Sequence, residues 1–156
     1  MTTYRKLKNT DNYLINKLIS DEGDSYQEFL NIGWSLNQII KQLLKNTNFS
    51  IGAYYNGSLT SFILGDLFNI EKISEYEILL LYVSKKFRRK GLGLNLINKI
   101  EENNRSLKKI YLEVSKNNVE AISFYKKMNF KKIFTRKNYF IYGNTKCDAL
   151  VMSKNY

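Results

Sequence analysis

The chain has 156 residues, of which 44% are apolar and 14% aromatic, which is enough for a single domain with one core spanning residues 1–156. No apolar run approaches the roughly 18 to 20 residues that a membrane span needs, and no apolar segment follows the first basic residues, so we expect a cytoplasmic protein. The only cysteine is Cys147 and there is no histidine, which excludes an internal disulfide and Ser-His or Cys-His catalysis. We therefore expect no metal site, and chemistry that uses carboxylates, phenols, lysines or backbone amides.

The net charge of +11 suggests a nucleic acid or another polyanion as partner. Lys, Asn, Ile and Tyr make up 67 of the 156 residues, a composition typical of an A+T-rich coding sequence, which weakens that interpretation. The charge is also uneven: residues 1–83 hold seven Lys/Arg against nine Asp/Glu, whereas residues 84–156 hold 18 against five. A basic nucleic-acid-binding module thus remains an alternative, and the positive field belongs to the second half.

The first half shows helical and extended periodicities in turn. Two amphipathic helices are expected, because apolar residues recur there at spacings of three and four. Asn-Gly between two β-forming runs is a strong hairpin signal. The predicted elements are a strand at 2–7, a helix capped by Thr10 or Asp11, a polar loop or turn at 21–33, a helix capped by Ser35, and strands at 51–55 and 59–64 joined by Asn56-Gly57.

After the hairpin comes a run of β formers, Tyr76–Val83, which is too short for a buried helix and predicts a central strand covered on both faces. The elements expected after it are a helix over 91–104 with a buried stripe of Leu92, Leu96, Ile97 and Ile100, a strand at 109–114, a helix capped by Asn117 or Asn118 and ending at Lys127, and strands at 130–134 and 149–154. The order β-α-α-β-β-β-α-β-α-β-β predicts an α/β (α+β) fold with a mixed sheet.

The segment 83–93 carries the most informative motif, because it places a basic, glycine-containing turn between a strand and a helix N-terminus. Such a junction binds anions, since glycines let the backbone approach a ligand and the first N–H groups of the helix point toward it. Arg88, Arg89 and Lys90 add positive charge. A P-loop is disfavoured because no Lys-Ser or Lys-Thr follows the second glycine, and a dinucleotide fold because Leu96 replaces the third glycine.

R-x-x-G-x-G after a strand that ends in valine resembles the acetyl-CoA motif of the Gcn5-related N-acetyltransferase (GNAT) family. The downstream IYLEVS and NNVEAISFYKKMNF resemble the second half of that family, and the most similar subgroup is the RimI-type N-terminal alanine acetyltransferases of ribosomal proteins. Further similarities lie at 136–140, at 148–152 and at Trp34-Ser35. The chain departs from the pattern at Asn129, where relatives have glycine, and at 141–143, where they often have proline.

The resemblance implies a mixed, mostly antiparallel sheet of about seven strands flanked by about four helices, with acetyl-CoA as co-substrate. It also implies which residues contact the cofactor: the strand end would polarise the thioester carbonyl, the turn would hold the pyrophosphate, and an asparagine would reach the pantetheine arm. These residues are Leu81, Tyr82 and Val83, then Arg88, Arg89, Lys90, Gly91, Leu92, Gly93 and Leu94, and finally Asn118.

The resemblance gives catalytic roles to Glu113 and Tyr125. An α-amine has a pKa of about 7.7 to 8.0, so a base must accept its proton near neutral pH. Glu113 is the expected base, directly or through a water, and partial burial would make it a stronger one. Tyr125 would protonate the departing thiolate. Without the resemblance, Glu113 is an ordinary strand residue and Tyr125 an ordinary core aromatic.

The acceptor is expected to be a protein N-terminus, in particular the alanine of a small-subunit ribosomal protein, and a small amine such as a polyamine, an amino sugar or an amino acid is the alternative. Trp34 and Tyr139 are the expected substrate contacts. The acidic residues of the front region, Asp21, Glu22, Asp24 and Glu28, would attract a basic peptide, or else form a solvated loop.

Overall fold

The computed structural model describes residues 1–23 and 33–156, which form one seven-stranded sheet with helices on both faces. The strand order is β1-β2-β3-β4-β5-β7-β6; β4 and β5 are parallel and every other neighbouring pair is antiparallel. The elements are β1 (Thr2–Lys6), η1 (Asn9–Asp11), α1 (Asn12–Ser20), α3 (Leu36–Leu44), β2 (Ile51–Tyr55), β3 (Ser58–Ile70), β4 (Ile73–Val83), η2 (Lys85–Phe87), α4 (Leu92–Glu102), β5 (Leu107–Ser115), α5 (Val119–Lys127), β6 (Lys131–Tyr142) and β7 (Thr145–Asn155). The predicted fold class is confirmed.

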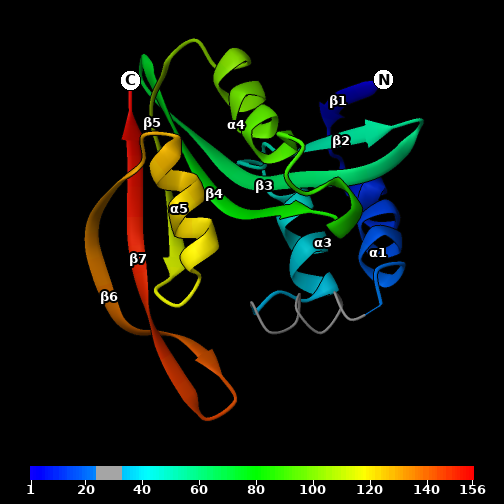
Figure 1. Ribbon diagram of the computed structural model, residues 1–156. Helices are drawn as coiled ribbons and strands as arrows, with labels where there is room; N and C mark the ends of the chain where they lie inside the picture. Colours follow the sequence, from blue (N-terminus) through cyan, green and yellow to red (C-terminus); the bar gives the residue numbers. More distant parts are fainter. Residues whose placement is uncertain (24–32) are drawn as a thin grey trace.

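The helices divide the core into two layers (Figure 1). Helices α4 and α5 pack on one face, over a cluster that includes the stripe of α4 (Leu96, Ile97 and Ile100). Helices α1 and α3 pack on the other face, over a second cluster. The β6–β7 hairpin extends beyond both helical layers at the bottom of the view. The described helices of the second face, α1 and α3, lie over the β1–β4 half of the sheet.

Local sequence accounts for most element boundaries. Asn56 and Gly57 adopt positive φ and close the β2–β3 hairpin, as expected for a two-residue turn. Ser35 caps α3 with its side chain and, together with Gln38, forms a capping box. Asn118 caps α5 by accepting from the Ala121 N–H. Asp11 precedes α1 without capping it through its side chain, because its carboxylate is engaged elsewhere.

Strand β4 contains the irregularity that creates the site. Leu64 of β3 pairs with Leu80 and the next residue pairs with Ile78, so Leu79 is an extra residue, a β-bulge. Because side chains alternate along a strand, one extra residue moves the later positions to the opposite face. Ile78 accordingly belongs to the cluster under α4 and α5, whereas Leu80 belongs to the cluster under α1 and α3. Pairing between β4 and β5 ends at Ile78 and Leu112, and the two strands separate beyond it.

The predicted cover of Tyr76–Val83 on both faces is incomplete, because Glu77, Leu79, Leu81 and Val83 are only partly buried. Glu77 shares its face with Tyr111 of β5, and none of the described helices packs over these two side chains. Strands β3 and β6 are also longer than predicted, since their polar ends pair with neighbouring strands. The predicted loop over 21–33 lies mostly outside the described residues. In the described ranges no helix has the length and apolar character to cross a membrane.

Candidate active site

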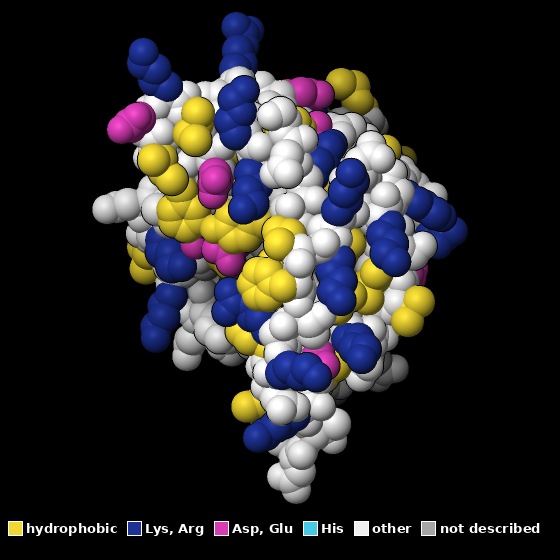
Figure 2. All heavy atoms as spheres, turned by 90° about the vertical axis from the view of Figure 1, so that its left-hand side faces the viewer, with side chains coloured by type: hydrophobic (Ala, Val, Ile, Leu, Met, Phe, Trp, Pro, Cys, Tyr) yellow, Lys and Arg dark blue, Asp and Glu magenta, His cyan; other side chains and the backbone are white. Residues whose placement is uncertain are grey.

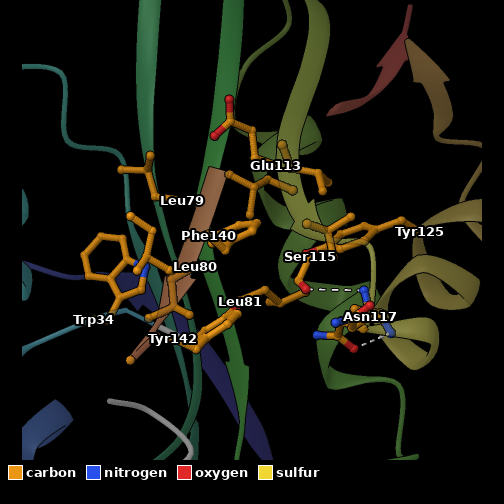
Figure 3. Close-up of a pocket in the computed structure, with 17 residues that line it drawn as sticks. Trp34, Leu79, Leu80, Leu81, Glu113, Ser115, Asn117, Tyr125, Phe140 and Tyr142 are labelled. Atoms are coloured by element: carbon orange, nitrogen blue, oxygen red, sulfur yellow. Dashed lines mark hydrogen bonds between the residues drawn. The ribbon is translucent and has the colours of Figure 1, made fainter. Parts of the chain in front are cut away.

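The separation of β4 from β5 opens a cavity of about 910 Å³. Figure 3 shows Leu81 in its middle, with Ser115 and Tyr125 on one side and aromatic side chains on the other. The lining residues come from the β4 bulge, the end of β5, the start of α5 and the β6–β7 hairpin: Trp34, Ile78, Leu79, Leu80, Leu81, Leu112, Glu113, Val114, Ser115, Asn117, Asn118, Ala121, Tyr125, Phe140, Ile141, Tyr142 and Gly143. Five residues predicted for cofactor, catalysis or substrate thus line one cavity: Trp34, Leu81, Glu113, Asn118 and Tyr125.

The predicted anion-binding turn follows β4, outside the cavity lining. Arg89 and Gly91 both adopt positive φ, of 62° and 78°, which folds the turn back before α4 begins. The first helical hydrogen bond runs from the Asn95 N–H to the Gly91 carbonyl, 2.9 Å, so the N–H groups of the first turn have no helical acceptor. Apart from Gly91 itself, its chain neighbours and nearby helix backbone, no heavy atom of the described structure lies within 4 Å of the position that a Cβ of Gly91 would take. This end of α4 therefore fits an anion such as a diphosphate.

The basic side chains of this turn differ in what they contact. Arg88 donates from Nε to the Val83 carbonyl, 3.0 Å, which fastens the turn to the end of β4. Arg89 is exposed and lies 4.0 Å from Glu120 of α5. Lys90 lies 5.1 Å from the Phe87 ring. All three side chains are exposed, and Arg88 is tied to the end of β4 through its Nε.

The two glycines of the turn have different physical roles. Gly91 is required by its backbone conformation, whereas Gly93 has ordinary helical geometry. A Cβ on Gly93 would lie 3.2 Å from the Phe124 ring, so this glycine lets α4 and α5 pack closely. Asn118 has its Oδ1 committed to the α5 cap, which leaves its Nδ2 for a ligand in the cavity.

Glu113 has a cationic partner that the sequence reasoning did not anticipate. Its Oε1 forms a salt bridge with Nε of Arg136 on β6 at 2.7 Å, and 17% of the Glu113 side chain is exposed. Tyr139 lies against the same carboxylate: a hydrogen bond to Glu113, followed by burial, raises the pKa of the Tyr139 phenol. Tyr139 is absent from the cavity lining, so in this structure it contacts the predicted base and not the cavity. The predicted base on β5 therefore forms an ion pair with a residue of β6, two strands away in the sheet.

A second carboxylate, Glu77, lies near Glu113 and was missed by sequence reasoning. It pairs in register with Tyr111, two residues before Glu113, and accepts from the Tyr111 hydroxyl at 3.4 Å. Burial, and then the charge of Glu113, raise the pKa of Glu77. Burial and neighbouring carboxylates raise the pKa of Tyr111 to about 12. The register that brings Glu77 and Glu113 together is not visible in either strand alone.

Tyr125 projects from α5 into the cavity (Figure 3). Its ring packs edge-on against Phe124 and Phe130, with centroids 5.2 and 5.4 Å away. Burial raises the pKa of its phenol far above the ordinary value, so the hydroxyl is protonated at neutral pH. This position suits a proton donor and excludes a phenolate base near pH 7.

The far end of the cavity is aromatic. Trp34, Phe140 and Tyr142 lie on the side opposite Tyr125 in Figure 3, and the last two stack with centroids 6.2 Å apart. Residues 141–143, where the sequence departs from the family pattern, thus supply part of the lining. Phe140, which the sequence does not predict as a site residue, lines the cavity beside them.

The predicted acidic entrance is only partly described. The carboxylate of Glu22 accepts from the Tyr82 hydroxyl at 2.6 Å and from the Lys85 N–H at 2.9 Å, so it fastens the end of α1 to the end of β4. Tyr82 correspondingly directs its side chain into the cluster under α1 and α3. Asp21 is exposed, and Asp24 and Glu28 lie outside the described residues.

Comparisons with known proteins agree with this geometry. Residues 15–130 match the model of the Acetyltransferase (GNAT) family. An N-alpha-acetyltransferase of Saccharolobus solfataricus is 37% identical over 75 residues, 46% of this chain and 43% of that protein, so the chain spans less than half of the length of this curated relative.

Solved structures of low sequence identity share the fold. The ribosomal-protein alanine N-acetyltransferase of Escherichia coli superposes with a TM-score of 0.81 at 20% identity, covering 99% of this chain and 94% of that one. Naa50 of Arabidopsis thaliana, bound to the bisubstrate analogue CoA-Ac-MVNAL, gives a TM-score of 0.77 at 24% identity and covers 99% of both chains. The family match covers most of the chain, and the chain belongs to the GNAT acetyltransferase family.

Proposed function

We propose that this protein transfers an acetyl group from acetyl-CoA to the N-terminal α-amine of another protein, and that an alanine-starting ribosomal protein is the acceptor. The observation that carries the proposal is the opening between β4 and β5, with a carboxylate, Glu113, and a protonated phenol, Tyr125, in its lining. The anion-binding turn begins where β4 ends. A long ligand with a diphosphate at one end and an acyl group at the other fits that arrangement.

Acetyl-CoA would supply the thioester. The first turn of α4, with Arg89 and Lys90, would hold the pyrophosphate, and Asn118 Nδ2 would donate to the pantetheine arm. The backbone of Leu81, at the bulge, would orient the acyl carbonyl. Naa50, whose fold this chain shares, is solved with an analogue that joins CoA to a peptide, which supports one cavity for both substrates.

Two proton movements are assigned to side chains. Glu113 receives the proton of the acceptor amine, directly or through a water, because it is the carboxylate in the cavity lining. Tyr125 donates its Oη proton to the departing sulfur, because its raised pKa keeps the phenol protonated until the thiolate forms. Attack by the amine needs no covalent acyl-enzyme, so a chain without histidine suffices.

Thermal unfolding with acetyl-CoA tests the cofactor independently of the acceptor. Ligand that binds only the folded state raises Tm, by an amount equivalent to about 2.7 kcal/mol at a hundred times Kd. Gly91→Val is expected to abolish that increase, because valine is strained at a φ of 78° and fills the space beside the helix N-terminus. Full stabilisation of the variant by acetyl-CoA would show that the turn does not hold the diphosphate.

A comparison of acceptors tests the substrate. Acetyl-CoA is supplied with an alanine-starting basic peptide, with the same peptide blocked at its N-terminus but containing lysine, and with spermidine. We expect acetylation of the free α-amine alone, detected by mass spectrometry. Preference for the blocked peptide or for spermidine would overturn the N-terminal assignment and leave an acetyltransferase of another amine.

A further inference from the structure

Strand β6 carries a bulge beside Glu113. Three residues of β6 lie between Arg136 and Phe140, whereas a single residue of β7, Asp148, lies between their partners Ala149 and Cys147. Asn138 adopts a positive φ of 51° inside the bulge, and its N–H donates to the Asp148 carboxylate at 2.9 Å. Bulges redirect side chains at the edges of sheets. Here Arg136 and Tyr139, three residues apart, both contact the carboxylate of Glu113.

The guanidinium of Arg136 is held in place by its surroundings. Its Nε lies 2.7 Å from Glu113 Oε1, and its central carbon lies 5.7 Å from the Phe134 ring and 5.4 Å from the Tyr139 ring. Contacts of a cation with two aromatic rings restrict its orientation. The ion pair therefore has a defined geometry although half of the Arg136 side chain is exposed.

The other groups that act on Glu113 are few. Glu77 of β4 is the neighbouring anion, and Tyr139 of β6 is a phenol whose pKa is raised. Tyr111 of β5 bonds to Glu77, and β7 faces Glu113 with the apolar Val151. Within the described residues, Arg136 is thus the cation paired with this carboxylate at 2.7 Å, and Glu77 is an anion that acts on it in the opposite direction.

We propose that Arg136 is a positioning residue that pairs with Glu113 and fixes its carboxylate at the cavity, so that the acceptor amine meets a proton acceptor in a defined place. This deepens the proposed function and depends on it only in assigning the amine proton to Glu113. A cation at hydrogen-bond distance favours the carboxylate over the carboxylic acid. The orientation of Glu113 is then set from β6, which lies two strands away from β5 in the sheet.

The test is the pH dependence of kcat/KM at saturating acetyl-CoA, with whichever amine the enzyme acetylates. On the acid side of this profile, kcat/KM falls as the pH is lowered. In Arg136→Gln the midpoint of this acid limb is expected to move upward by about one pH unit, with activity restored at higher pH, because Glu113 loses its cation. Glu77→Gln is expected to move the limb downward, because Glu113 loses its anionic neighbour. Arg136→Lys retains the charge and should keep the limb near its wild-type position.

Lys137→Gln is the matched control, because it removes the same charge from the adjacent, exposed position of the bulge. Its profile should coincide with that of the wild type. An unmoved acid limb in Arg136→Gln, or a loss that is equal at every pH, would overturn the proposal and leave Arg136 a structural role only.

A second readout does not need turnover. The side-chain carboxyl carbon of Glu113 can be followed by 13C NMR as the pH is lowered. Its protonation midpoint should rise in Arg136→Gln and stay unchanged in Lys137→Gln. If the wild type acetylates no amine, the proposed function fails, while this titration still decides whether Arg136 governs Glu113; an equal midpoint in the wild type and Arg136→Gln refutes it.

Discussion

Glu113 and Tyr125 line one cavity but have opposite environments. Glu113 lies against a guanidinium, so its negative charge is compensated, whereas Tyr125 lies between two phenylalanine rings, where no described charge favours a phenolate. Environments that separate the protonation states of two groups are how an active site assigns acid and base. These two environments are those that the proposed mechanism needs, in which the carboxylate accepts a proton and the phenol donates one.

The donor role of Tyr125 is tested by Tyr125→Phe, which removes one hydroxyl and almost no volume. We expect kcat to fall by about a hundredfold or more, the scale for losing a general acid, while the increase of Tm with acetyl-CoA is retained. Tyr13→Phe, on the exposed face of α1, is the control and should keep wild-type turnover. Wild-type kcat in Tyr125→Phe would remove this residue from the mechanism.

At the scale of elements, a buried polar contact fixes α3 to the sheet. The carboxylate of Asp66 on β3 accepts from Gln42 Nε2 and Thr47 Oγ1, both at 2.7 Å, and from Lys45 Nζ at 3.2 Å. Burial acts to raise the pKa of Asp66, but these three donors outweigh it and the pKa lies below its ordinary value of 3.8. Asp66 therefore stabilises the fold while it is ionised.

The lowered pKa of Asp66 determines how its contribution to the free energy of unfolding changes with pH. A carboxyl with a lowered pKa contributes its stabilisation above the unfolded pKa and loses it as the pH falls through the folded one. Asp66→Asn is thus expected to cost about 1 to 3 kcal/mol at pH 7, measured from urea midpoints, and less below the ordinary value of 3.8. Glu71→Gln, in the exposed β3–β4 turn, is the control and should leave the free energy of unfolding unchanged at both pH values. An equal deficit of Asp66→Asn at both pH values would contradict the assignment.

The sequence predicts those elements whose signals are local. Asn56-Gly57 closes its hairpin and the stripe of α4 is buried because turn chemistry and helical periodicity act within a few residues. The bulge at Leu79 left no such signal, since it lies in an unbroken run of β formers without glycine. The ion pair of Glu113 with Arg136 could not be predicted from the sequence either, because it depends on β5 and β6 lying on opposite sides of β7.

For the whole molecule, the relevant feature is where the positive charge lies. Residues 84–156, which include the anion-binding turn, hold 18 Lys/Arg against five Asp/Glu, whereas residues 1–83 hold seven against nine. Figure 2 shows many Lys and Arg side chains spread over the face of the β6–β7 side and fewer acidic side chains, some of which lie beside a hydrophobic patch. A surface with this asymmetry attracts a polyanionic cofactor over distances longer than a hydrogen bond.

That attraction predicts a dependence on salt. The KM for acetyl-CoA should rise as ionic strength increases, because screening shortens the range of the field, while kcat at saturation stays constant. The matched ligand is 3′-dephospho-acetyl-CoA, which carries about two negative charges fewer. Its KM should rise less steeply over the same salt series, measured at fixed acceptor concentration. Equal slopes for the two ligands would show that the excess charge of residues 84–156 does not act on the cofactor.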